Sequence, residues 1–157
     1  MLIGRYCDRG RPWLAAVVEI TELKVTAFVD FLVDTGADVS MIGPADCHRL
    51  GLEPLVYPGA PQVRQSPEPV TGIGGEVYPY LVRARLFFPA CDSKHVAVQT
   101  VNAMHVVTRE MTRLTAANAS ALPSILGWDI LGRFGTLILA RSEHDLRLLA
   151  REEKRDR

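Results

Sequence analysis

The segment from residue 31 to residue 42 reads Phe31-Leu-Val-Asp-Thr-Gly-Ala-Asp-Val-Ser-Met-Ile42. An apolar run leads into Asp34-Thr35-Gly36 and a second apolar run follows, which is the pattern of two strands joined by a tight turn. Gly36 permits either a close approach of other atoms or a positive φ, and the Thr35 hydroxyl can bind nearby backbone. The segment therefore predicts that Asp34 lies on a stiff loop, where a carboxylate suits acid–base chemistry. The alternative is a solvated aspartate in an ordinary turn, because a tripeptide alone has low specificity.

The composition limits the class of protein. A chain of 157 residues predicts one domain, residues 1–157, with a core at about 13–150 and a charged tail at 151–157. The formal net charge is zero, which favours neither nucleic acid nor an anionic membrane as a partner. Cys7, Cys47 and Cys91 lie too far apart in the sequence for a metal motif, so no metal or other cofactor is expected. An odd number of cysteines without a membrane-spanning run indicates a cytoplasmic protein.

The residues before and after the Asp34 loop predict mostly strands. Alternating apolar residues indicate strands at 13–20 and 24–33, which would form a hairpin that ends at Asp34. Pro44 can open a short helix that ends near Gly51. Later strands are predicted at 76–88, 94–102 and 104–107, with a closing hairpin of residues 136–140 and 146–150.

A glycine-rich segment follows a proline-rich one. Residues 70–78 read Val70-Thr-Gly-Ile-Gly-Gly-Glu-Val-Tyr78, which predicts the tip of a hairpin. This tip is either an ordinary turn or a mobile flap that covers a groove. A phosphate loop is excluded, because no helix and no Gly-Lys-Ser/Thr follow.

The second distinctive segment lies near the C-terminus. It reads Ser124-Ile-Leu-Gly-Trp-Asp-Ile-Leu-Gly-Arg-Phe-Gly135. A short apolar strand is predicted to end at Gly127, and a helix of about two turns is predicted to continue to Gly132 or Gly135.

Taken together, these segments resemble the retroviral-type (retropepsin-like) aspartic proteases, in their bacterial and cellular branch. The resemblance rests on Asp34-Thr35-Gly36-Ala37-Asp38, the Gly72-Ile73-Gly74-Gly75 tip, and Ile125-Leu126-Gly127-Trp128-Asp129-Ile130-Leu131, in that order. It spans residues 13 to 150, and its softest part is the glycine-rich tip.

The resemblance implies a fold and a set of roles. The fold would be a closed, mostly-β acid-protease barrel with one short helix near the C-terminus, and each chain of a homodimer would supply half of the site. Asp34, Thr35 and Gly36 would be catalytic, with Thr35 crossing to the partner loop and Gly127 packing behind the loop. Substrate would be bound by Gly36, Ala37, Asp38, Ile73, Gly74 and Gly75.

The chain also departs from the viral pattern. Many viral members carry Arg-Asn where this chain has Trp128-Asp129, so Asp129 is expected to be a structural residue at the helix start and not a second catalytic acid. The arginine that usually pairs with the acid at Asp38 is absent from position 128. Three arginines remain as alternative partners for Asp38: Arg5, Arg9 and Arg11.

The chemistry independently favours a dimer. Peptide hydrolysis by carboxylates needs two acids that share one proton, and this chain contains one Asp-Thr-Gly. A two-fold axis would supply the second. The sequence therefore predicts a homodimeric aspartic endopeptidase that acts on peptide or protein substrates. The alternatives are a non-catalytic peptide-binding or dimerisation module of the same fold, and an unrelated β-barrel. Leu32, Val39, Ile42, Ile73 and Leu126 are candidate walls of an apolar substrate pocket.

Overall fold

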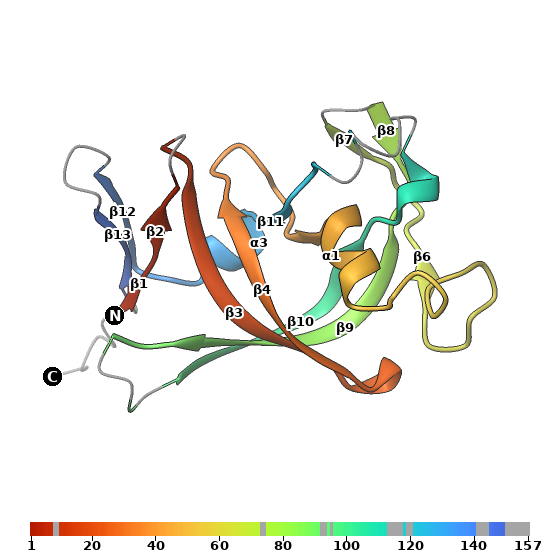
Figure 1. Ribbon diagram of the computed structural model, residues 1–157, viewed down its shortest axis with the longest axis horizontal. Coiled ribbons are helices and arrows are strands. Elements are labelled where there is room, and N and C mark those ends of the chain that lie inside the picture. Colours follow the sequence, from red (N-terminus) through yellow and green to blue (C-terminus); the bar gives the residue numbers. More distant parts are fainter. Residues whose placement is uncertain are drawn as a thin grey trace, which may run out of the picture.

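The computed structural model describes residues 1–7, 10–72, 75–91, 94, 96–112, 118, 121–140 and 145–149. These residues form mostly β-structure with two short α-helices (Figure 1). Six strands close into a barrel in the order β3-β4-β11-β5-β10-β9, because β9 also pairs with β3. The prediction of a mostly-β closed barrel is therefore confirmed. The barrel strands are β3 (Pro12–Ile20), β4 (Val25–Val33), β5 (Met41–Ile42), β9 (Tyr80–Pro89), β10 (Val96–Val106) and β11 (Ser124–Leu126).

The β3–β4 hairpin is the longest feature of the N-terminal part. Alternate residues of β3, among them Ala16, Val18 and Ile20, are buried, and the residues between them are not, as the alternating sequence predicts. A 3-10 turn, η1 (Thr21–Leu23), joins the two strands, and Lys24 takes a left-handed conformation with φ of 55° to leave that turn. The hairpin therefore carries the chain directly to Asp34.

The strand β11 comes from the C-terminal part of the chain but lies between β4 and β5. It pairs in parallel with β4, with Leu126 opposite Val33, and antiparallel with β5, with Ile125 opposite Met41. The loop from residue 34 to residue 40 joins β4 to β5, so it must pass over the end of β11. This strand order brings the two distinctive segments of the sequence together.

The β9–β10 hairpin forms the opposite wall of the barrel. Two separate strands were predicted at 94–102 and 104–107, and this prediction was wrong, because β10 is continuous from Val96 to Val106. A register shift between Val101 and Met104 marks a bulge in the pairing with β9, which accounts for the apparent break in the sequence pattern. The predicted strand 76–88 is instead divided between β8 (Gly75–Val77) and β9.

Smaller elements extend the barrel at its ends. The strands β2 (Arg5–Tyr6) and β6 (Arg64–Gln65) add to the barrel sheet next to β3 and β9. The strands β1 (Leu2–Ile3), β12 (Thr136–Ala140) and β13 (Asp145–Leu149) form a separate sheet at one end of the molecule. The hairpin of β7 (Val70–Gly72) and β8 lies at the other end (Figure 1). The predicted tail at 151–157 lies outside the described residues.

Two α-helices follow the strands that border the loop. The helix α1 (Pro44–Arg49) begins at Pro44 as predicted and is followed by Gly51, whose φ is +66°. The helix α3 (Trp128–Leu131) has one turn and not the two that were predicted. The Gly135 amide donates to the Leu149 carbonyl at 2.7 Å, so the chain has already turned towards β12. A further 3-10 turn, η2 (Arg109–Met111), follows β10.

The core fills the barrel and the space beneath the two helices. Its largest fully buried side chains are Phe31, Phe88, Ile20, Ile42, Leu52, Leu86, Met104, Leu126, Ile130, Leu131, Leu146 and Leu148. These side chains come from both distinctive segments, from the chain between them and from the strands β3 and β13 outside them, so the loop rests on a packed core. In the part of the chain described, no helix has the length and apolar character needed to span a bilayer.

Candidate active site

Asp34 follows directly on the last residue of β4. Its amide donates to the Leu126 carbonyl at 3.1 Å, which extends the pairing of β4 with β11 by one residue. Its carboxylate accepts a hydrogen bond from the Gly36 amide, with 2.9 Å between N and Oδ1. Asp34 is half-buried, whereas Thr35 and Gly36 are exposed. The loop therefore presents an oriented carboxylate at the protein surface.

Two reasons for a glycine at position 36 were considered, a positive φ and the close approach of other atoms, and the structure supports the second. Gly36 does not have a positive φ, and a Cβ atom at this position would lie 3.3 Å from Asp34 Oδ1. A side chain here would therefore crowd the carboxylate. The Thr35 hydroxyl makes no hydrogen bond to the described residues, so the prediction that it stiffens the turn was wrong. Thr35 itself is exposed on the surface of the loop.

The stiffness comes instead from the start of α3. The Trp128 amide donates to the Ala37 carbonyl at 2.9 Å, and the Asp129 amide donates to the Asp38 carbonyl at 3.1 Å. The Trp128 indole Nε1 donates to the Thr35 carbonyl at 2.7 Å. The first turn of a helix has amides without partners inside the helix, and here the loop carbonyls accept two of them. These three hydrogen bonds therefore attach the loop to the start of α3.

A buried serine joins the same two segments from below. Ser40 has no exposed surface, and its Oγ donates to Asp129 Oδ1 at 2.6 Å and accepts from the Gly127 amide at 2.9 Å. The Asp129 carboxylate is thus used within the fold, as expected for a structural residue. A Cβ atom on Gly127 would lie 2.7 Å from the Val39 carbonyl carbon and oxygen, so only glycine allows this packing. The predicted packing of Gly127 behind the loop is confirmed.

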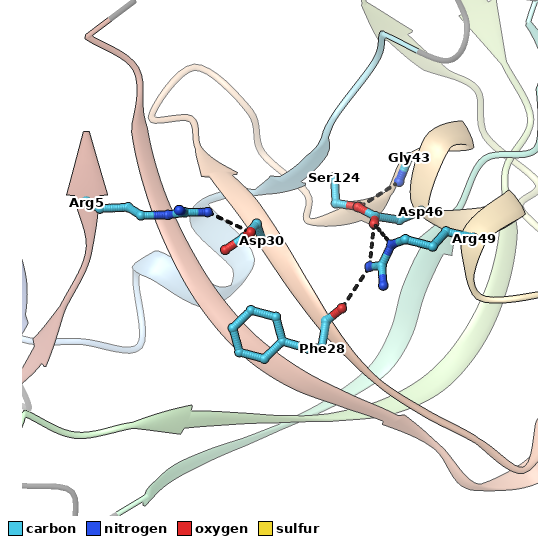
Figure 2. Close-up of polar contacts among 7 residues, drawn as sticks. All are labelled: Arg5, Phe28, Asp30, Gly43, Asp46, Arg49 and Ser124. Atoms are coloured by element: carbon cyan, nitrogen blue, oxygen red, sulfur yellow. Dashed lines mark hydrogen bonds and ion pairs between the residues drawn. The ribbon is translucent and has the colours of Figure 1, made fainter. Parts of the chain in front are cut away.

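A matching set of contacts joins β11 to α1 (Figure 2). Ser124 is fully buried, and its Oγ donates to Asp46 Oδ2 at 2.6 Å and accepts from the Gly43 amide at 3.1 Å. The Arg49 guanidinium donates to Asp46 Oδ1 at 2.6 Å and to the Phe28 carbonyl at 2.7 Å. In both sets a buried serine binds a glycine amide and an aspartate of a short helix: Ser40 binds Gly127 and Asp129, and Ser124 binds Gly43 and Asp46 at the start of α1. The segment at 124–135 is therefore held both by the Asp34 loop and by the helix that follows it.

His105 lies next to the Ser40–Asp129 pair, opposite Met41 across β5 and β10. Burial lowers the pKa of His105, and the Asp129 carboxylate and a hydrogen bond with the Ser40 backbone partly oppose this effect. Its Nδ1 is buried without a partner among the described residues. Although serine, histidine and aspartate meet here, Ser40 is fully buried and its hydroxyl already donates to Asp129. This cluster is therefore not a nucleophilic triad.

Two of the three arginines that were predicted as possible partners of Asp38 contact other residues. Arg5 instead binds Asp30 at 2.7 Å (Figure 2). Arg11 lies over the Trp13 ring, 5.9 Å from its centroid. Arg9 lies outside the described residues. Among the cations that are described, none forms an ion pair with Asp38, whose side chain is exposed.

The predicted flap is present as a hairpin. Val70 pairs with Val77 and Gly72 with Gly75, and Gly75 has a φ of +97°. Two of the predicted flap residues, Ile73 and Gly74, lie outside the described residues. The described stems therefore confirm the hairpin, and the role of its tip stays a prediction.

The prediction of residues that line an apolar substrate pocket was wrong for two of them. Leu32 and Val39 are partly exposed, but Ile42 and Leu126 have no exposed surface and belong to the core. Ile73 again lies outside the described residues. Sequence reasoning also missed the roles of Ser40 and of the Trp128 indole. A lone serine within an apolar run is a signal for a buried hydroxyl, but its partner is 89 residues away.

No cluster of three or more histidine, cysteine, aspartate or glutamate side chains in the described ranges is placed to hold a metal ion. Comparisons with protein-family models and with curated proteins find no match for this chain. The arguments for a function therefore rest on the geometry of the Asp34 loop and on the motifs that surround it.

Proposed function

We propose that the protein is an aspartic endopeptidase of the retropepsin-like type, whose active site is shared by two identical chains. The observation that carries this proposal is the Asp34 loop. A half-exposed carboxylate at the end of β4 is oriented by the Gly36 amide, and the loop is fixed by hydrogen bonds from Trp128 and Asp129. A surface turn with a merely solvated aspartate has no need of such support.

The chemistry requires a second carboxylate close to the first. Two such acids a few Å apart cannot both ionise, so they share one proton and titrate as a pair. The ionised partner takes a proton from a water molecule, which attacks the peptide carbonyl carbon. The protonated partner donates its proton to the carbonyl oxygen, which gives a neutral tetrahedral diol. The carboxyl group that took the proton from water then passes it to the amide nitrogen as the C–N bond breaks, and a diol hydroxyl returns a proton to the other carboxylate, so that an amine and a carboxylic acid leave.

A second copy of the same loop is the source of that carboxylate in this proposal. The sequence contains one Asp-Thr-Gly, and two-fold symmetry is the commonest form of assembly. Thr35 and Gly36 are exposed, which leaves the loop surface free for a partner. In the dimer Thr35 would bind the partner loop, while Gly36, Ala37, Asp38 and the hairpin tip at Ile73, Gly74 and Gly75 would bind the substrate backbone.

The test is cleavage of a diverse peptide mixture by wild type, Asp34→Asn and Asp30→Asn, at a protein concentration that populates a dimer. Asp30 lies on β4, the strand that leads into Asp34, and binds Arg5, so its variant is a matched control for the loss of one carboxylate. Cleavage by wild type and Asp30→Asn, but not by Asp34→Asn, is the expected result. Sedimentation of each protein would establish its oligomeric state.

Two outcomes would overturn the proposal. A folded, dimeric wild type that binds peptides without cutting them would establish the non-catalytic binding module. Cleavage that persists in Asp34→Asn would assign the activity to another group or to a contaminant.

The residue after Gly36 predicts where on the pH scale the enzyme works. A serine at position 37 could donate a hydrogen bond towards the carboxylates and favour their ionised form, whereas Ala37 cannot. We therefore expect the acid limb of the pH–rate profile to lie at higher pH in wild type than in Ala37→Ser. Coincident profiles would refute this role.

A further inference from the structure

The Thr35 carbonyl and the Gly36 amide belong to one peptide group, and each end of that group has a specific partner. The carbonyl oxygen accepts from Trp128 Nε1 at 2.7 Å. The amide nitrogen donates to Asp34 Oδ1 at 2.9 Å. The indole and the carboxylate are therefore linked through a single rigid plane.

We propose that Trp128 is a positioning residue for Asp34, acting through the peptide group between Thr35 and Gly36. By holding the carbonyl oxygen, the indole fixes the rotation of this plane, and the plane then points its N–H at the carboxylate. Hydrogen bonds in such a chain also polarise one another, so the indole strengthens the bond that Asp34 accepts. For catalysis this inference rests on the proposed function.

The packing of Trp128 does not provide a simpler explanation. Its side chain is 47% exposed, so it contributes little to the core. A tryptophan serving only as apolar filling has no need to aim its N–H at a loop carbonyl. Trp13 shows the contrast, because its Nε1 is buried and has no hydrogen-bond partner among the described residues.

The decisive variant removes the N–H and keeps an aromatic ring. In Trp128→Phe the main-chain bond from residue 128 to the Ala37 carbonyl remains possible, so the loop stays attached to α3. We expect kcat to fall about tenfold, the effect of one lost hydrogen bond to the site, with KM changed less than about twofold. Trp13→Phe is the matched control and is expected to leave both constants unchanged.

The indole N–H can also be removed without changing the shape of the side chain. This is possible because the chain has two tryptophans, and one of them can first be replaced by phenylalanine. In the Trp13→Phe background, biosynthetic incorporation of 3-benzothienylalanine replaces Trp128 alone and substitutes sulfur for its N–H. The shape of the side chain is retained, and the donor is lost. We expect this protein to reproduce the kcat of Trp128→Phe.

The second readout does not depend on catalysis. The Gly36 amide proton resonance reports the hydrogen bond to Asp34, and we expect it to move upfield and to exchange faster with solvent in Trp128→Phe, but not in Trp13→Phe. An unchanged Gly36 resonance would overturn the inference, even if kcat fell. An altered resonance in a protein that shows no proteolysis, wild type included, would support the positioning role while refuting the proposed function.

Discussion

Replacement of Ser40 by alanine tests whether the contacts beneath the loop hold the two segments together. The Ser40 hydroxyl is buried and has two partners, the Gly127 amide and the Asp129 carboxylate. Alanine leaves the buried Gly127 N–H without an acceptor, which costs about 1–3 kcal/mol. The lost bond to the charged Asp129 adds about 1.5 kcal/mol, the lower end of its range, because Asp129 is half-buried and water replaces part of the interaction.

The expected loss is therefore about 2.5–4.5 kcal/mol in the free energy of unfolding, a large fraction of the ~5–15 kcal/mol typical of a domain. Urea unfolding followed by circular dichroism measures this loss, as a lower midpoint at an unchanged slope. All proteins must be compared at one concentration, because any self-association would contribute to apparent stability.

Ser66→Ala is the matched control for this experiment. Its hydroxyl is also largely buried, but it donates to the Glu68 carbonyl at 2.7 Å and accepts from the Glu68 amide at 3.3 Å, two residues away in the same loop. Only contacts with this near neighbour are lost, so a change of less than about 1 kcal/mol is expected. If Ser40→Ala were no less stable than Ser66→Ala, the argument that Ser40 joins the two segments would be refuted.

Three further predictions follow from neighbouring features. Gly127→Ala should destabilise by more than about 2 kcal/mol, since its Cβ would meet the Val39 backbone at 2.7 Å. Gly72→Ala should be nearly neutral in the same urea assay, since among the described residues beyond its chain neighbours no atom would lie within 4 Å of the new Cβ. Burial lowers the pKa of His105, so the unfolded chain binds the proton more readily; stability should fall as pH drops below about 6.5, and a urea series at several pH values should show a weaker fall in His105→Gln. Burial raises the pKa of Cys47 to about 12, so iodoacetamide at pH 8 should modify the exposed Cys91 and spare Cys47 in the native protein, as peptide mass spectrometry would reveal.

The sequence predicted those elements whose signal is local. Alternation along residues 13–20 and 24–33 indicated the hairpin that leads to Asp34, and Pro44 marked the start of α1. The bulge near Val101 broke the pattern of β10 and suggested two strands where one exists. Local patterns report propensity, and a bulge changes the face of the strand without ending it.

The residues that hold the Asp34 loop in place could not be predicted from local sequence patterns. Ser40 and Trp128 bind partners that are 89 and 93 residues away, and nothing in a single sequence specifies such pairs. The motif identified Asp34 as the candidate acid, but only the structure identifies the residues that orient its carboxylate. The burial of Ile42 and Leu126 likewise depends on where β11 inserts, which composition does not indicate.

The insertion of β11 between β4 and β5 has a consequence for how the protein folds. The contacts that join the Asp34 loop to Trp128 and Asp129 each close a chain segment of roughly ninety residues, and such closures are slow because their entropic cost precedes any gain from contact. During synthesis the N-terminal hairpin can form early, but its loop stays unsupported until residues 124–131 have emerged. Any activity of Asp34 would therefore arise only after residues 124–131 have been made.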